Sequence, residues 1–89
     1  MDAAHLEELG RIERDYWWHV NKRALVVQTL DRWFPAPGAL VEGGFGGGEN
    51  LRVFRAMGYE VHGLDFLEAA VERARSFGVS ASVHDLQLP

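Results

Sequence analysis

Residues 39–50 read ALVEGGFGGGEN, a short apolar run followed by five glycines within six residues and then a polar pair. The apolar run, residues 39–41, is too short for a helix and fits a buried strand. Beyond the glycines, Leu51, Phe54 and Met57 recur at helical spacing. We therefore predict that the glycines form a turn between a strand and a helix.

A turn of this kind can hold a ligand, because glycine permits close approach and a helix N-terminus presents unpaired N–H groups. A phosphate-binding P-loop would need lysine and then serine or threonine where Glu49 and Asn50 stand. The dinucleotide-binding fingerprint would need a third glycine at position 49. The glycines instead follow the spacing Gly44-x-Gly46-x-Gly48.

Glu42 precedes the glycines and Glu49 follows them, with no basic residue between to offset their repulsion of a pyrophosphate. A ligand that carries positive charge suits this turn better. An acidic residue followed by Gly-x-Gly-x-Gly, here within residues 41–48, resembles the first motif of class I S-adenosylmethionine-dependent methyltransferases. The resemblance implies that Gly44, Gly46 and Gly48 contact S-adenosylmethionine and that S-adenosylhomocysteine is the product. It also implies that Glu42 shapes the methionine end of the site.

The turn differs from the usual family pattern at three positions: Gly43, Phe45 and Gly47. These differences keep open a second function, a non-catalytic and self-associating module that has the same fold. A third possibility is half of an NAD-dependent oxidoreductase, but that fold needs the glycine that Glu49 replaces. A plain flexible turn is the simplest alternative for any glycine-rich loop.

Composition indicates one soluble globular domain, with 47% hydrophobic and 25% charged residues in 89. The absence of cysteine fits an intracellular protein. The N-terminus does not resemble a secretion signal and no apolar run reaches membrane-spanning length, so we expect a cytoplasmic protein without membrane contact. The net charge is −4 and arginine alternates with glutamate, a pattern that gives no indication of nucleic-acid binding.

The four histidines lack the spacing of a zinc site, so no metal is expected. His62 and His84 fall within predicted strands, where we expect partnered packing residues and not catalytic bases. No catalytic residue can be assigned from the sequence.

Residues 1–38 are predicted to form a helical cap. One interrupted helix covers residues 3–18 and a second begins at Asn21, with the proline-rich segment 35–38 ending it. The apolar face expected for the second helix consists of Leu25, Val26, Leu30 and Trp33.

The aromatic residues ahead of Arg23 resemble the N-terminal segment that packs over the cofactor in many small-molecule methyltransferases. The resemblance implies that Tyr16, Trp17 and Arg23 are lid residues and that Tyr16 and Arg23 contact the cofactor. The alternative is that the aromatic residues 16–18 are core anchors of the cap.

The second predicted strand, residues 59–65, ends at Asp65, twenty-one residues after Gly44. A carboxylate at this position can accept hydrogen bonds from both hydroxyls of a ribose. In the resembled family the corresponding acid does so, and Phe66 would border the adenine. Asp65 can equally cap the next helix.

An amphipathic helix is predicted for residues 67–77, closed by Gly78, and its charged side chains are interpreted as a solvated face. These charged residues are Glu68, Glu72, Arg73 and Arg75. A third strand, residues 80–84, leads to Asp85 and Leu86. The resemblance implies that Asp85 contacts the adenine amino group and that the Leu86 N–H reaches a ring nitrogen. A routine turn aspartate is the alternative for Asp85.

Together these elements predict an α/β fold, a Rossmann-like three-layer αβα arrangement with a partial parallel sheet in strand order 3-2-1. Residues 1–38 form the cap and residues 39–89 the N-terminal half of the cofactor-binding domain. We expect an S-adenosylmethionine-dependent methyltransferase, or its cofactor-binding fragment, that acts on an unidentified small molecule. Because the first strand would be an open edge, we also expect a homo-oligomer or a piece of a longer protein.

Overall fold

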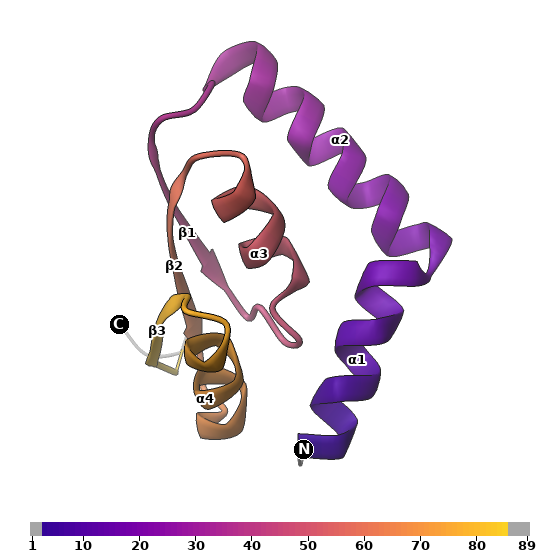
Figure 1. Ribbon diagram of the computed structural model, residues 1–89, viewed down its shortest axis with the longest axis vertical. Helices are drawn as coiled ribbons and strands as arrows, with labels where there is room; N and C mark the ends of the chain where they lie inside the picture. The colour runs from indigo at the N-terminus through magenta and orange to yellow at the C-terminus, as the bar shows by residue number, and fades with distance from the viewer. Residues whose placement is uncertain (1–2, 86–89) are drawn as a thin grey trace.

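Two helices precede a strand-helix-strand-helix-strand unit in the computed structural model, which describes residues 3–85 (Figure 1). The elements are α1 (Ala3–Asp15), α2 (Trp17–Trp33), β1 (Ala39–Gly43), α3 (Glu49–Ala56), β2 (Glu60–Asp65), α4 (Glu68–Ser76) and β3 (Ser80–Val83).

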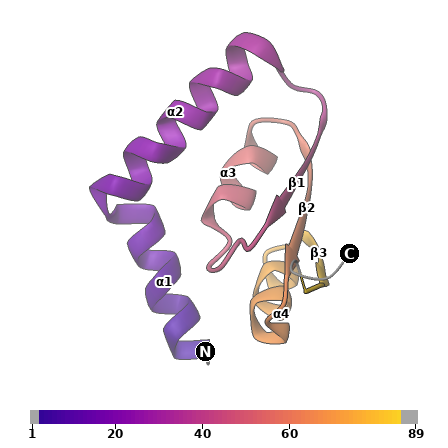
Figure 2. The same cartoon turned by 180° about the vertical axis from the view of Figure 1, so that it is seen from behind.

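The three strands form one parallel sheet in the order β1-β2-β3, which is the predicted 3-2-1 order counted from the other edge. Ala39 pairs with Glu60 and His62 pairs with Ser80, which fixes the register of both strand pairs. Helices α3 and α4 lie on the same side of the sheet, and α1 packs outside them (Figures 1 and 2). The chain is therefore a small α/β domain that is compatible with a Rossmann-like αβα fold.

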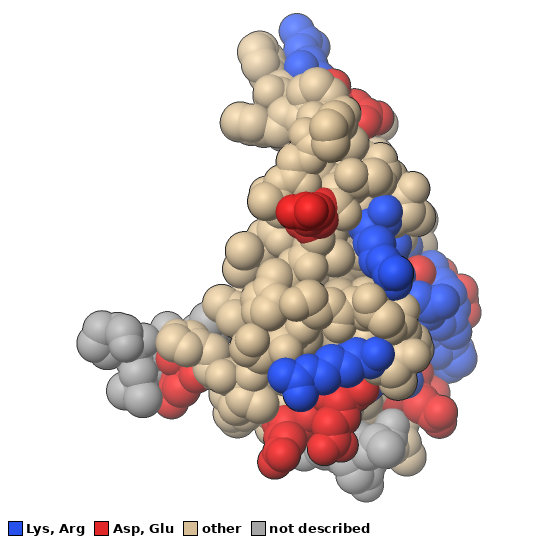
Figure 3. Space-filling view, turned by 60° about the vertical axis from the view of Figure 1, so that its left-hand side comes forward, with Lys and Arg blue, Asp and Glu red and all other residues tan. Residues whose placement is uncertain are grey.

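The opposite face of the sheet is not covered by any described helix. Figure 3 turns the strand side toward the reader and shows a mainly uncharged surface with isolated acidic and basic side chains. On this face the ring of His62 contacts the hydroxyls of Ser80 at 2.6 Å and Ser82 at 2.9 Å. The prediction of a partnered packing histidine in this strand is confirmed for His62. His84 instead lies one residue beyond β3 and is exposed.

The hydrophobic core lies between the sheet and the helices, and both the loop and α1 contribute to it. Phe45 and Leu6 are buried in the same cluster as Leu51 of α3 and the small side chains of α4. A Cβ atom added to Gly63 would lie 2.5 Å from Cδ1 of Phe45. The missing side chain of Gly63 thus provides the space in which the Phe45 ring packs.

The boundary between the first two helices differs from the prediction. Tyr16 has an extended backbone conformation, with φ −76° and ψ 131°, and separates α1 from α2. The two helices therefore meet at Tyr16, and α2 begins four residues before Asn21.

Helix α2 packs mainly against α1 and buries none of its residues. Leu25 and Trp33, two members of its predicted apolar face, are exposed, as are the three aromatic residues 16–18. The prediction of aromatic core anchors was wrong, because no described element lies against that side of α2.

Glycine ends two of the later helices as predicted. Gly58 and Gly78 follow α3 and α4 with φ values of 104° and 79°, a region of backbone conformation that L side chains rarely adopt. Within residues 3–85, no helix has the length and apolar character that crossing a membrane requires.

Candidate functional site

The glycine loop between β1 and α3 has alternating left-handed residues. Gly44, Gly46 and Gly48 have φ values of 66°, 57° and 85°. These are the three glycines of the predicted spacing, so the loop follows the register read from the sequence. Within the loop, the Gly44 N–H donates to the carbonyl of Leu64 at 2.7 Å and the Gly48 N–H donates to that of Phe45 at 3.1 Å.

Asp65 ends β2 beneath this loop and is only 5% exposed. Its Oδ2 accepts a hydrogen bond from the Gly46 N–H at 3.2 Å, and its Oδ1 accepts one from the Leu67 N–H at 3.0 Å. The carboxylate therefore ties the glycine loop to the segment that leads into α4. Leu67 and not Asp65 is the N-cap of α4, and no side chain caps this helix, so the alternative in which Asp65 caps α4 is wrong.

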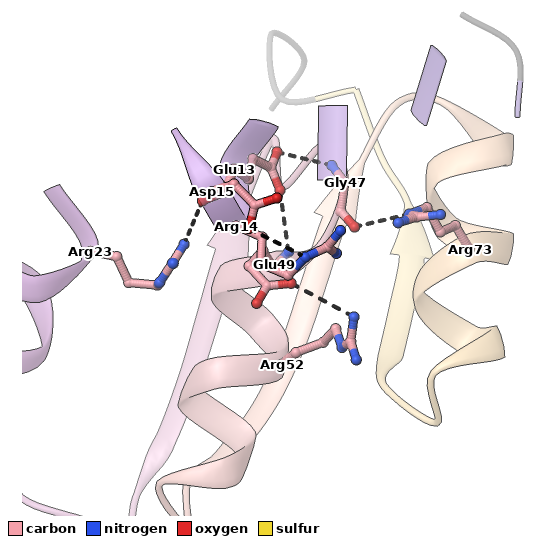
Figure 4. A network of polar contacts seen from close by, with 8 residues as sticks. All are labelled: Glu13, Arg14, Asp15, Arg23, Gly47, Glu49, Arg52 and Arg73. Atoms are coloured by element: carbon pink, nitrogen blue, oxygen red, sulfur yellow. Dashed lines mark hydrogen bonds and ion pairs between the residues drawn. The ribbon is translucent and has the colours of Figure 1, made fainter. Parts of the chain in front are cut away.

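Glu13 of α1 supplies a second internal acceptor for the loop (Figure 4). Its Oε2 accepts from the Gly47 N–H at 3.1 Å and its Oε1 accepts from the Glu49 N–H at 3.3 Å. A carboxylate is favourable here because the N-terminus of a helix carries partial positive charge. The carbonyl of Glu13 in turn accepts from Nη1 of Arg23 at 3.0 Å, which joins the start of α2 to the same junction.

Close backbone contact holds α1 against the loop. A Cβ atom on Gly47 would lie 2.6 Å from the Cα of Gly10, so Gly47 has no room for a larger residue unless the backbone moves. A Cβ atom on Gly10 would instead meet Nη2 of Arg73 at 2.5 Å. Nε of Arg73 donates to the Gly47 carbonyl at 3.1 Å (Figure 4). The interpretation of Arg73 as part of a solvated face was therefore wrong.

Sequence reasoning missed Glu13 and its junction with the loop. The available signal was the spacing of Leu6, Gly10 and Glu13, which are four and three residues apart and so share one helix face. Glycine in the interior of a helix lowers the stability of that helix. Its presence on an inward face therefore indicates that another backbone approaches closely there.

A cleft of about 380 Å³ lies between the N-terminal helices and the glycine loop. Volumes of this size are within the range of small-molecule sites. The N-terminal helices contribute Glu13, His19, Lys22, Arg23 and Val26 to its lining, and the remainder comes from Glu42, Gly43, Gly44, Phe45, Asn50 and Phe54.

Glu42 is the partly buried acid of this cleft. Nδ2 of Asn50 donates a hydrogen bond to Oε2 of Glu42 at 3.1 Å. Burial raises the pKa of Glu42, and this effect exceeds the lowering by the Asn50 hydrogen bond. The charge of Glu13 also raises the pKa of Glu42, while that of Lys22 lowers it. The cleft thus contains both a desolvated acid and nearby basic groups.

The structure brings together three of the predicted cofactor contacts. Glu42, Gly44 and Arg23 line the cleft, although Tyr16 does not and is exposed. Trp17 is likewise exposed and outside the cleft lining.

The other predicted contacts lie elsewhere on the domain. Gly46 and Gly48 lie in the loop segment on which α1 packs, where Gly46 donates to Asp65. Phe66 and Asp85 are exposed near the carboxyl ends of β2 and β3. Leu86 lies outside the described residues.

A larger hollow of about 510 Å³ lies at the other end of the sheet, where all three strands begin. Its lining includes Leu40, Val61 and Val79. In open parallel sheets ligands bind outside the carboxyl ends of the strands. The cleft beside the glycine loop is therefore the better candidate site in spite of its smaller volume.

Among residues 3–85, no group of three or more histidine, cysteine, aspartate or glutamate side chains is arranged to hold a metal ion. No family model matches this chain, and neither a curated protein nor a solved structure is significantly similar to it. The assignment of function therefore depends on the loop, the cleft and the chemistry of the side chains that line them.

Proposed function

We propose that the cleft binds the methionine portion of S-adenosylmethionine and that the chain is a methyltransferase or the cofactor-binding part of one. The observation that carries the proposal is the pairing of charges in the cleft. Glu42 provides a partly buried carboxylate, and α2 provides Lys22 and Arg23 to the same lining. The methionine portion carries an ammonium and a carboxylate on one carbon atom. Its binding site therefore needs an acidic and a basic group close together.

The adenosyl portion would lie along the carboxyl ends of the strands. Asp65 is 5% exposed and already accepts from the Gly46 and Leu67 N–H groups, so it could accept from ribose hydroxyls only if its carboxylate became more accessible. Phe66 is 68% exposed next to it and offers a flat apolar surface for a base. Asp85, and Leu86 beyond the described residues, would complete this end. The second helical layer of an αβα fold would cover the exposed face of the sheet.

The bound cofactor would supply a methyl group activated by a sulfonium. The residues of this chain would bind and orient it, and orientation alone contributes much of the rate in such transfers. The acceptor would be a small molecule. A second copy of the chain, or further parts of a longer protein, would contribute the remaining walls of the acceptor site.

Calorimetric titration with S-adenosylhomocysteine tests the proposal. We expect saturable binding by the unmodified chain, clear weakening by Glu42→Gln and no change with Glu60→Gln, a matched change at an exposed glutamate. NAD is the control ligand and should not bind. Equal affinities for the Glu42→Gln and Glu60→Gln variants would exclude the cleft as the methionine site.

A second candidate function, a non-catalytic and self-associating module, is supported by a different observation. Five N–H groups of the loop region, those of Gly44, Gly46, Gly47, Gly48 and Glu49, already donate to acceptors within the chain. A folded and monodisperse sample that sediments as a dimer and binds no adenosyl ligand would favour the module. A monomer that binds S-adenosylhomocysteine would exclude it.

A further inference from the structure

The start of α3 is the position at which related turns hold a phosphate, because the first N–H groups of a helix point at the ligand and its dipole favours negative charge. In this chain the corresponding donors are the N–H groups of Gly47 and Glu49. Both donate to the carboxylate of Glu13, one to each oxygen, at 3.1 and 3.3 Å. The position of a bound anion is therefore occupied by an acidic side chain from another helix.

The backbone that carries Glu13 is held over the loop by contacts that do not involve the carboxylate oxygens. The backbone of Gly10 packs directly on Gly47, so the helix cannot rotate freely over the loop. Arg73 fixes the Gly47 carbonyl, and Arg23 fixes the carbonyl of Glu13 itself. The backbone of α1 is therefore fixed over the loop, and another anion could enter only if the Glu13 side chain rotated away from the two N–H groups.

Acidic side chains around the turn add repulsion toward a phosphate, although the basic Lys22 and Arg23 line the same cleft. Glu42 lines the same cleft as Glu13. Glu49 begins α3, and its carboxylate lies 3.7 Å from the guanidinium of Arg52. Three acidic side chains thus surround the turn, and like charges a few ångströms apart repel strongly near a protein surface.

We propose that Glu13 is a specificity-determining residue, an internal anion that excludes phosphate-bearing nucleotides from the glycine loop. The loop retains the backbone form of a nucleotide-binding turn, but its anion position is filled by the chain itself. This inference goes beyond adenosyl binding and does not depend on it, because exclusion of phosphate can be measured without any cofactor.

Titration of the full chain with inorganic pyrophosphate, followed through the ¹⁵N–¹H signals of Gly47 and Glu49, tests the proposal. We expect no saturable shift in the unmodified chain. Glu13→Ala should gain saturable binding with an apparent Kd at least about tenfold below the lower bound that the titration sets for the unmodified chain, because both the charge and the bulk are removed. Glu13→Gln should gain less, since the amide still occupies the position and one oxygen can still accept.

Glu7→Ala is the matched control, an exposed glutamate on the same helix, and should behave as the unmodified chain. Circular dichroism establishes that each variant is folded. Saturable binding of pyrophosphate at Gly47 and Glu49 in the unmodified chain would overturn the proposal, as would a folded Glu13 variant that gains none. Unfolding of both Glu13 variants would overturn it as well, because the carboxylate would then be a structural cap and not a selectivity element.

Discussion

Helices α1 and α2 follow one another in the chain and both carry apolar residues at helical spacing, yet only α1 is built into the domain. Leu6 of α1 is 1% exposed, whereas Leu25 and Trp33 of the longer α2 are 65% and 64% exposed. The two helices differ in how closely their backbones approach the rest of the domain. Gly10 lets α1 pack directly on the loop at Gly47, and α2 has no comparable position. Apolar periodicity alone does not decide which helix face is buried.

The largest effect should come from removing the buried anchor of α1. Leu6→Ala is expected to lower the free energy of unfolding by about 2–5 kcal/mol, because it leaves a cavity in a packed core. Leu25→Ala on α2 should change it by no more than about 0.5 kcal/mol. Urea denaturation of both variants measures the contrast. Similar losses would mean that α2 has an apolar partner in solution.

A smaller effect is expected from a single methyl group at the loop. Gly47→Ala should cost about 1–3 kcal/mol, because its Cβ would overlap the backbone of Gly10. Hydrogen exchange should show that amides of α1 lose protection first. Gly38→Ala is the control, since a Cβ there would meet the Tyr59 ring at an ordinary 3.6 Å. Unchanged protection of α1 in the Gly47 variant would show that the helix is not held at this contact.

The hydrogen bond that links α2 to α1 should contribute less to the free energy of unfolding. Arg23→Met keeps the apolar stem but removes the hydrogen bond to the Glu13 carbonyl, so we expect a loss of about 1 kcal/mol. Arg32→Met, near the other end of α2, removes a guanidinium that lies over the Trp33 ring and should have a smaller effect. Thermal unfolding of the Arg23→Met and Arg32→Met variants measures the two losses. A larger loss for the Arg32 variant would contradict the assignment of Arg23 as the link.

The smallest expected effect is a gain in stability, and it should come from the substitution Glu42→Gln. Burial raises the pKa of Glu42 above the ordinary value of 4.5, so the fold favours the protonated carboxyl group. This stabilisation is complete only below the ordinary pKa of the unfolded chain. Its contribution is lost as the pH rises through the raised pKa. Glu42→Gln retains an oxygen for Asn50 and removes this titration, so the variant should be slightly more stable at neutral pH.

Thermal midpoints between about pH 4 and pH 8 measure this effect. The difference between the unmodified chain and the Glu42→Gln variant should grow as the pH rises and then level off. Glu60→Gln, at an exposed glutamate, should follow the unmodified chain. A Glu42→Gln variant that is less stable at neutral pH would show that the ionised carboxylate stabilises the loop.

Local patterns in the sequence were sufficient for the strand-helix alternation and for the sheet order. The sequence predicted a turn with the spacing Gly44-x-Gly46-x-Gly48, and these three glycines of the loop have positive φ. The direction of Phe45 could not be predicted, since it depends on the absence of a side chain at Gly63, eighteen residues away on another strand. The periodicity of α2 predicted an apolar face but carried no information on a partner.

The candidate site was predicted only in part. Glu42 and Arg23 were assigned from the loop motif and from the aromatic segment, and both line the cleft. Lys22 and His19 were missed, although their positions on one turn of α2 put them on the same side as Arg23. Asp65 ends β2 as predicted, but its hydrogen bond from the Gly46 N–H is a tertiary contact that no local pattern encodes.

The junction at Glu13 has a consequence for the order of folding. Its carboxylate meets the Gly47 N–H across 34 positions of the chain, and closing so long a segment costs more entropy than forming neighbouring turns. Arg73, which fixes the Gly47 carbonyl, lies a further 26 positions along. We therefore expect α1 to dock after the transition state, so that changes at Glu13 or Gly47 speed unfolding and leave the folding rate nearly unchanged. Helix α1 would thus precede the other described helices in the chain and dock after them.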